Sequence, residues 1–202
     1  MNSNYKILKF KSNNSKEVDD LISIEEPLEI ILKYKNKENW IENSISVTMR
    51  TPGDDEDLVS GFLFNERVIE KIDHIESIKV SGKTVGQYKL KNKVIATINN
   101  SENVDIDKIK RNFLTNSSCG VCGKTSLDSL EIIKKDIIIK SIPKIHHEII
   151  MKSPDMLRQN QSEFSKTGGI HASGLFNASG KIVAIKEDVG RHNALDKLIG
   201  YV

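Results

Sequence analysis

The distribution of glycine is the feature that most constrains how this chain of 202 residues can fold. No glycine occurs before Gly53, whereas eight of the twelve glycines fall between Gly120 and Gly200. Because glycine tolerates positive φ angles and close backbone approach, the second half must hold tight turns that the first half lacks. We therefore expect two unlike portions, a β-rich portion over residues 1–100 and a glycine-rich portion over residues 101–202.

The first portion contains runs of alternating or β-branched residues. Residues 27–32 and 44–50 have this pattern and are predicted to be two strands of a sheet. Four acidic residues, Asp54 to Asp57, then precede an apolar helical pattern, and we interpret them as the charged first turn of an amphipathic helix. Between residues 75 and 98, short strand-like runs predict a small antiparallel meander with turns at 81–83 and 91–93.

The second portion alternates helical and strand patterns. Helical periodicity covers residues 101–116 and 125–135, and a further helix is predicted over 146–164, interrupted or restarted at Ser153-Pro154. A β-hairpin is expected next, with strands at 170–176 and 181–185, followed by a final helix whose apolar stripe consists of Ala194, Leu195, Leu198 and Ile199.

The charge balance narrows the classes of partner. There are 30 basic and 28 acidic residues, a net charge of +2, which argues against sequence-independent binding of nucleic acid. No apolar run approaches the roughly 20 residues that a membrane span requires, and the first residues lack the apolar core of a signal peptide. We expect a soluble, cytoplasmic protein that binds neither nucleic acid nor membrane.

The only two cysteines, Cys119 and Cys122, form a C-x-x-C loop beside Gly120 and Gly123, just before a predicted helix. A helix N-terminus and the neighbouring Lys124 both lower thiol pKa and favour the reactive thiolate. Such a thiolate could attack a disulfide, accept a sulfur atom as a persulfide or ligate a metal. A pair of small buried cysteines in a turn is the non-functional alternative.

The functional interpretations of the C-x-x-C loop differ in the further residues that each one requires. A structural zinc site needs four ligands, but there is no other cysteine and the only close histidine pair is His146-His147, so we expect no metal. A thioredoxin-like dithiol usually lies early in a βαβ unit, which is not the case here. A zinc deaminase needs a glutamate in H-x-E, and Ser173 occupies that place after His171. Sulfur relay needs only an accessible thiolate on a loop, and the sequence favours it.

A second candidate site is the polar corner from Glu187 to Asn193, where Arg191 and His192 follow a glycine at a predicted helix start. Helix N-termini bind anions, and arginine recognises phosphate in a bidentate manner. The alternative for the corner is a capping and salt-bridge cluster, and His171 and His192, each taken singly, are interpreted as hydrogen-bonded structural histidines. The sequence leaves these interpretations open.

Four segments together resemble the formate dehydrogenase accessory sulfurtransferase family, FdhD. They are SISVTMRTPGDD (44–55), NFLTNSSCGVCGKTSL (112–127), TGGIHASGLF (167–176) and EDVGRHNALDKLIG (187–200). The resemblance begins near Ile24 and implies an α/β (α+β) fold of cytidine deaminase type, a mixed sheet with helices, beside an N-terminal β-rich part. It also implies a sulfurtransferase in which Cys119 matches the persulfide-forming cysteine and Cys122 its neighbour.

For that family, a cysteine desulfurase donates the sulfur. The acceptor is the molybdenum or tungsten bis(guanine dinucleotide) cofactor, which then enters formate dehydrogenase. For this chain we expect molybdenum bis(molybdopterin guanine dinucleotide) as a bound substrate. Family habit suggests a homodimer. As a hypothesis, the cofactor phosphates lie near a set of glycines and basic side chains, namely Gly168, Gly169, His171, Arg191 and His192. A cofactor-binding chaperone without sulfur chemistry and a dithiol oxidoreductase are the alternatives.

Two departures from the family pattern bear on cofactor handling. Position 186 is lysine where arginine is expected in many relatives, so the charge is kept but bidentate phosphate recognition is lost. The apolar stripe of the last helix reaches the end of the chain, and the C-terminal segment with which the family helps to hold the cofactor has no counterpart after Gly200. We expect the chain to be short for this family, which would affect cofactor binding more than the thiol loop.

Overall fold

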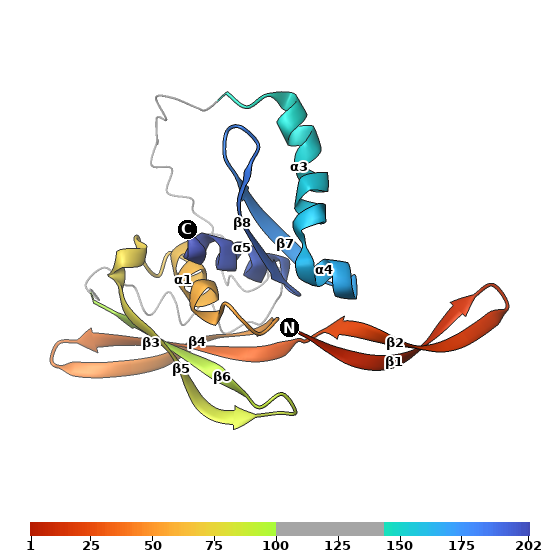
Figure 1. The fold of residues 1–202 in the computed structure, drawn as a ribbon. Helices are drawn as coiled ribbons and strands as arrows, with labels where there is room; N and C mark the ends of the chain where they lie inside the picture. The colour runs from red at the N-terminus through yellow and green to blue at the C-terminus, as the bar shows by residue number, and fades with distance from the viewer. Residues whose placement is uncertain (100–143) are drawn as a thin grey trace, which may run out of the picture.

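The computed structural model describes residues 1–99 and 144–202, which form a mixed α+β fold (Figure 1). The elements before the gap are β1 (Asn2–Lys11), β2 (Asn14–Ser23), β3 (Glu26–Asn36), β4 (Asn39–Arg50), α1 (Asp55–Asn65), the 3-10 turn η1 (Ile72–His74), β5 (Ile75–Val85) and β6 (Leu90–Ile98). Those after it are α3 (His147–Asn160), α4 (Ser162–Thr167), β7 (His171–Phe176), β8 (Ile182–Asp188) and α5 (Arg191–Tyr201). The expected fold class is confirmed, and the first portion is rich in strands.

The main sheet has the strand order β4-β3-β6-β5 and forms one wall of the core. Along β3, Leu28, Ile30 and Leu32 are fully buried while the residues between them face the other side, as the two-residue period of a strand requires. They pack against Leu58 and Leu63 of α1 in a single apolar cluster. Each such fully buried side chain contributes about 1.5–3 kcal/mol to stability.

Helices α1 and α5 lie against each other between this sheet and the β7–β8 hairpin (Figure 1). Their backbones approach so closely that a Cβ atom at Gly61 would overlap the carbonyl of Asp196, and one at Gly200 would overlap the carbonyl of Asp57. Since α1 belongs to the first portion of the chain and α5 to the second, this contact joins the two portions. The division at residue 100 itself stays a prediction.

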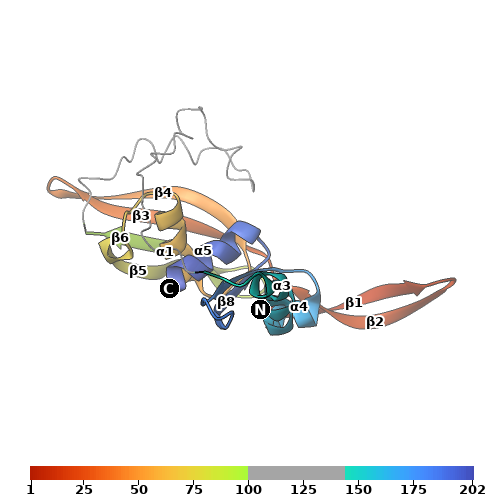
Figure 2. The same ribbon diagram turned by 90° about the horizontal axis from the view of Figure 1, so that it is seen from above.

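The strands β1 and β2 form a long hairpin, called the arm below, which the sequence patterns did not predict. It pairs only with itself, from Asn2 opposite Ser23 to Lys11 opposite Asn14, and extends away from the rest of the molecule (Figure 2). Its base is attached to α4, where the hydroxyl groups of Ser23 and Thr167 lie 2.8 Å apart. Most side chains of the arm are exposed, so no regular spacing of buried apolar residues marks its strands in the sequence.

The antiparallel pairing predicted within residues 75–98 is confirmed between β5 and β6, but the predicted turns are wrong. Residues 81–83 and 91–93 lie within strands β5 and β6, and the chain instead reverses between Gly86 and Lys89, where both residues have positive φ. Strand β6 then pairs in parallel with β3, from Glu29 opposite Lys93 to Lys33 opposite Thr97. The serine-glycine-lysine run is an irregularity within β5, where the register with β6 shifts.

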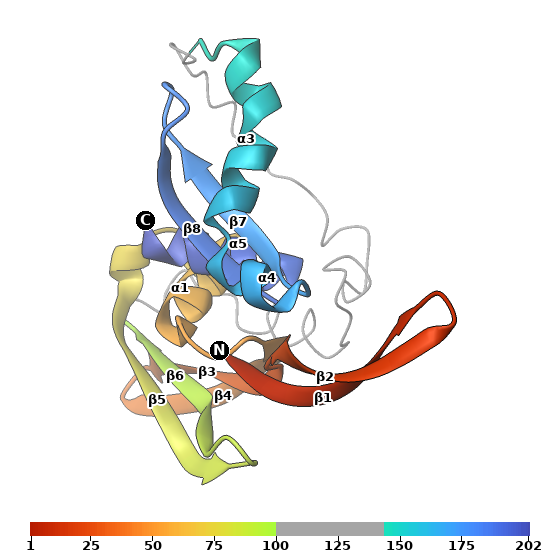
Figure 3. The same cartoon turned by 45° about the vertical axis from the view of Figure 1, so that its right-hand side comes forward.

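The helix expected over residues 146–164 is present, but its break is not at Ser153-Pro154. Pro154 lies inside α3, and the chain breaks at Gln161, beyond which α4 begins (Figure 3). A proline removes the N–H that would bond to the carbonyl four residues earlier. Here that carbonyl belongs to Ile150, and the Ser153 hydroxyl donates to it at 2.9 Å, so the helix continues.

The predicted hairpin of β7 and β8 is confirmed. Its turn is held by the Asn177 side chain, which accepts hydrogen bonds from the backbone N–H groups of Ser179 and Lys181, and by Gly180 at a φ of +82°.

The helices predicted at 101–116 and 125–135 lie outside the described residues. Among the helices of 1–99 and 144–202, none has the length and apolar character needed to span a bilayer.

Candidate functional site

The structure brings five of the seven predicted site residues to one end of the β7–β8 hairpin. His171 begins β7 and pairs with Asp188, which ends β8, while Arg191 and His192 begin α5 immediately afterwards. Gly168 and Gly169 join α4 to β7 at the same end. The other two predicted residues, Cys119 and Cys122, lie outside the described residues.

The two glycines have a local structural explanation. Gly168 ends α4 in the left-handed conformation, with a φ of +69°, and its N–H donates to the Phe164 carbonyl at 2.8 Å. A Cβ atom at Gly168 would meet no atom within 4 Å, and at Gly169 only the Thr167 carbonyl at 4.0 Å. Both positions are therefore open to solvent, and a helix stop accounts for Gly168.

The start of α5 leaves the N–H groups of its first turn without a side-chain acceptor. The first intrahelical bond runs from Ala194 N–H to the Gly190 carbonyl at 2.9 Å, and no side chain caps the helix. The N–H groups of the first turn precede any intrahelical acceptor, and the helix dipole makes this end positive. Arg191 and His192 are exposed beside it. This end of α5 can attract an anion.

A buried carboxylate fixes the approach to this helix. Asp188 is fully buried, and its Oδ1 accepts hydrogen bonds from Gly190 N–H at 2.9 Å and from Asn193 Nδ2 at 3.1 Å. Its Oδ2 accepts from Thr51 N–H at 3.0 Å and lies 2.8 Å from the Lys197 ammonium. Four donors thus replace the water that a buried carboxylate loses.

The same contacts attach the corner to the segment at the end of β4. Lys197, 2% exposed, also donates to the Thr51 carbonyl at 2.8 Å, and Val189 N–H donates to the Thr51 hydroxyl at 3.1 Å. The amide of Asn193 donates to the Met49 carbonyl at 2.7 Å. We call Met49, Thr51, Asp188, Asn193 and Lys197 the buried polar network. It places two of the sequence segments singled out above, 44–55 and 187–200, in direct contact.

The acidic run before α1 does more than cap the helix, contrary to expectation. Asp54, at the N-cap position, makes no capping bond with its side chain. Asp55 instead forms a bidentate pair with Arg50, which is 1% exposed, at 2.8 and 3.0 Å. Lys186 binds Asp57 at 2.7 Å and Asp54 at 3.1 Å. Although burial lowers it, these two carboxylates raise the pKa of Lys186 above its ordinary value.

Some residues of the polar corner therefore support the fold, and others are exposed and free to contact a ligand. Glu187 accepts hydrogen bonds from the N–H groups of Glu163 and Phe164, both at 2.9 Å, and so caps α4. With Asp188 engaged in the buried polar network, the capping interpretation holds for the two acidic residues. Arg191 and His192 remain exposed, and the anion-binding interpretation now concerns them alone.

Sequence reasoning placed Asn193 in the polar corner but missed Lys197, which lies one turn further along the buried side of α5. The predicted apolar stripe is also incorrect at Leu195, which is 44% exposed, while Asp196 and Lys197 are buried. A hydrophobic pattern cannot find a helix face that is buried through ion pairs. The spacing of Asn193 and Lys197, four residues apart beside Ala194 and Leu198, was the available signal.

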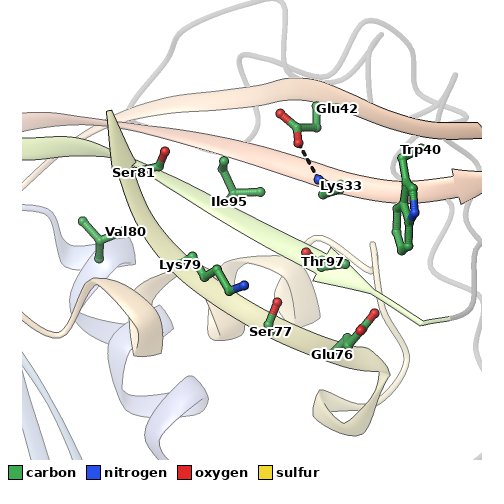
Figure 4. Close-up of a pocket in the computed structure, with 10 residues that line it drawn as sticks. All are labelled: Lys33, Trp40, Glu42, Glu76, Ser77, Lys79, Val80, Ser81, Ile95 and Thr97. Carbon is green, nitrogen blue, oxygen red and sulfur yellow. Dashed lines mark hydrogen bonds and ion pairs between the residues drawn. The ribbon is translucent and has the colours of Figure 1, made fainter. Parts of the chain in front are cut away.

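Neither a cavity on the main sheet nor the one metal-compatible cluster of the described residues involves these positions. A cavity of about 480 Å³ lies on the side of the main sheet away from the helices, between Trp40 and Lys33 on one side and β5 on the other (Figure 4). The donor atoms of His146, His147 and Glu148 lie within 4.8 Å of one another at the start of α3. That end of a helix disfavours a cation, and His146 Nδ1 already accepts from Glu148 N–H at 3.4 Å.

Comparisons with known proteins agree with the resemblance of the motifs. The model of the FdhD/NarQ family matches residues 23–202. The chain is 47% identical over 185 residues to the sulfur carrier protein FdhD of Picrophilus torridus, covering 92% of this chain and 64% of that protein. It is 38% identical over 195 residues to that of Sulfolobus acidocaldarius, covering 96% and 67%. The chain thus spans about two thirds of the length of these relatives.

A solved structure supports the fold. The crystal structure of a Desulfotalea psychrophila protein, provisionally assigned as a formate dehydrogenase accessory protein, superimposes with a TM-score of 0.58 at 21% sequence identity. The superposition covers 98% of this chain and 68% of that one. At this identity the likeness concerns the architecture only.

Proposed function

Because the chain belongs to the FdhD/NarQ family, we propose that it carries sulfur in the maturation of formate dehydrogenase. The observation that carries this proposal is the 47% identity, over 92% of the chain, to a relative named as a sulfur carrier protein. The C-x-x-C loop supplies the chemistry that such a role needs. In this proposal a cysteine desulfurase donates the sulfur, and formate dehydrogenase receives the sulfurated cofactor. The reaction takes place in the cytoplasm, where thiols stay reduced.

In the proposed reaction the Cys119 thiolate attacks the outer sulfur of the donor's cysteine persulfide. A sulfur–sulfur bond forms on Cys119, the corresponding bond in the donor breaks, and the donor cysteine leaves as a thiolate. In the second step the Cys122 thiolate attacks the Sγ of Cys119, the sulfur–sulfur bond of the persulfide breaks, and a Cys119–Cys122 disulfide forms. The outer sulfur leaves at the sulfide level for the molybdenum or tungsten bis(guanine dinucleotide) substrate. The chain acts as a sulfurtransferase in this scheme and works as a homodimer.

Mass spectrometry after incubation with a cysteine desulfurase and cysteine tests the first step. We expect the peptide that contains Cys119 to gain one sulfur atom, and Cys119→Ala to abolish the gain. Cys122→Ala, the matched control, should still be loaded. Normal loading of the Cys119→Ala protein would exclude the relay, and a reversible Cys119–Cys122 disulfide without added sulfur would indicate a dithiol oxidoreductase instead.

We further propose that the corner formed by Gly168, Gly169, His171, Arg191 and His192 binds the phosphates of the guanine dinucleotide. The support is physical. An uncapped helix start, a guanidinium and two exposed imidazoles share one end of the hairpin, and the buried polar network holds that end in place. His171 and His192 would contribute hydrogen bonds to the phosphate oxygens.

Guanosine diphosphate is a simple probe of this corner. Replacing Arg191 and His192 together by alanine should weaken its binding at least tenfold in calorimetry, because both side chains are exposed and neither supports the fold. The matched control, Lys181→Ala with His74→Ala, removes the same kinds of charge elsewhere and should leave the affinity unchanged. Equal affinity of the two double variants would place the phosphates elsewhere on the chain.

A further inference from the structure

A second cavity, of about 380 Å³, lies where the base of the arm meets the β5–β6 turn. Three separate segments form it: Tyr5 comes from β1, Gln87 and Tyr88 from the turn, and the rest from the end of β2 and the start of β3. Its full lining is Tyr5, Ile22, Ser23, Ile24, Glu25, Glu26, Gln87 and Tyr88. None of these residues belongs to the site proposed for sulfur transfer.

The lining combines aromatic rings, carboxylates and apolar side chains, and it contains no basic residue. Tyr5 and Tyr88 present phenol rings, whose faces attract cations. Glu25 and Glu26 supply two negative charges, although the whole chain carries a net charge of +2. Ile22 and Ile24 add aliphatic surface. A ligand that suits all three must have a cationic head on an apolar stem.

The charge of Glu26 is not neutralised by the nearest cation. Its Oε2 accepts from the neutral amide of Asn92 at 3.1 Å. Arg50 lies close by, but its guanidinium forms the bidentate pair with Asp55 described above. Across residues 1–99 and 144–202, neither Glu25 nor Glu26 takes part in an ion pair.

The pocket is held in shape before any ligand arrives. Arg50 donates to the Glu26 carbonyl at 3.2 Å and to Asn92 Oδ1 at 3.3 Å, so both the backbone and the side-chain partner of Glu26 are fixed. The turn passes directly over the carboxylate, since a Cβ atom at Gly86 would lie 3.6 Å from its Oε1. The phenol oxygens of Tyr5 and Tyr88 lie 3.4 Å apart and join the arm to the turn.

We propose that this pocket receives an arginine side chain presented by a partner protein. A guanidinium is planar, so it can stack on a phenol ring while its N–H groups engage carboxylates, and its three-carbon stem can lie along the isoleucines. Charge complementarity selects this occupant, because the pocket offers only acceptors, π faces and apolar surface. The inference concerns recognition of a partner and does not depend on the sulfur-transfer proposal.

The test uses the full chain labelled with ¹⁵N and titrated with N-acetyl-arginine methylamide, which mimics an arginine within a protein. We expect saturable shifts of the amide signals of Tyr5, Gln87 and Tyr88, with a dissociation constant on the order of 1 mM. The isosteric citrulline derivative, which lacks the charge, should bind at least tenfold more weakly. Equal shifts with both compounds, or shifts elsewhere only, would overturn the proposal.

Two further titrations distinguish an arginine side chain of a protein from other cationic ligands. Free arginine should bind no more tightly than the blocked compound, and preference for the free amino acid over the blocked one would indicate a small-molecule site instead. The lysine derivative should bind more weakly than the arginine derivative, and the reverse order would contradict the stacking argument.

Variants complete the assignment. Glu25→Gln with Glu26→Gln should weaken binding of the arginine derivative at least tenfold, whereas Glu17→Gln with Glu38→Gln removes the same charge from exposed positions outside the pocket and should not. Should Glu26→Gln unfold the chain, Glu25→Gln alone and Tyr88→Ala provide the same comparison. Unchanged affinity in folded Glu25→Gln and Tyr88→Ala proteins would remove the pocket from consideration.

Discussion

Asp196 is a buried carboxyl group of α5 with an unusual titration. It is 8% exposed, and burial raises its pKa to about 6, against the opposing effect of a hydrogen bond from Asn65 Nδ2 at 2.5 Å. The negative charges of Glu66 and Asp188 raise it further. The folded protein therefore holds this proton at pH values where the unfolded chain, with a normal aspartate, has released it.

The expected consequence is a loss of stability as pH rises from about 4 to about 6, since the native state binds more protons than the unfolded state over this interval. Asp196→Asn should abolish this slope and stabilise the protein at pH 7.5 by about 1–3 kcal/mol, with little effect at pH 4. Urea unfolding at the two pH values measures the difference. The control is Asp155→Asn, on the exposed face of α3, and equal pH slopes in both variants would contradict the role of Asp196.

Single residues also show where sequence reasoning succeeds and where it stops. The sequence predicted Arg191 and His192 because a glycine precedes them at a predicted helix start. Lys197 was not found, because its burial depends on Asp188 and on the Thr51 carbonyl, which is 146 residues away in sequence. An ion pair of this kind has no local signature, and only the folded chain brings its members together.

Among the elements, the crossing of α1 and α5 depends on glycine. Gly61 and Gly200 both lie inside helices, where glycine costs about 1 kcal/mol relative to alanine. The close contact of the two backbones offsets this cost, because neither position has room for a Cβ atom. Here the absence of a side chain serves packing, and no turn is involved.

Gly61→Ala should accordingly destabilise the protein by about 2–4 kcal/mol despite the better helix propensity of alanine, because the helices must move apart. Thermal or urea unfolding measures the loss. Gly169→Ala, at a position open to solvent and with ordinary φ, is the matched control and should change stability by less than about 0.5 kcal/mol. A neutral or stabilising Gly61→Ala would show that the crossing tolerates a methyl group.

The elements that sequence patterns predicted well are those with one buried face. Strand β3 alternates strictly and was found, as were β4, the helix α1 and the β7–β8 hairpin. The arm was missed because almost all of it is exposed, so no hydrophobic period marks it. The break in α3 was misplaced because a side-chain hydroxyl compensates for the proline, which the sequence pattern alone does not reveal.

For the molecule as a whole, the central question is whether the two portions unfold together. Ion pairs of Lys186 with Asp54 and Asp57 cross between β8 and the start of α1, and join residues more than a hundred positions apart. The buried pair of Lys197 with Asp188 belongs to the second portion, but both members bind the backbone of Thr51 at the end of β4. Together with the glycine crossing, they favour a single cooperative unit, although the sequence suggested two portions.

Lys197→Met tests this cooperativity, because it leaves the buried charge of Asp188 without its cation and should cost about 3–5 kcal/mol. In a urea series, Trp40 fluorescence reports on β4, since it is the only tryptophan, and NMR signals of β8 amides report on the second portion. We expect both midpoints to fall by the same amount and to coincide in wild type and variant. The exposed control, Lys181→Met, should shift neither. If the β8 midpoint fell while that of Trp40 stayed in place, the chain would consist of two separately folding domains divided near residue 100.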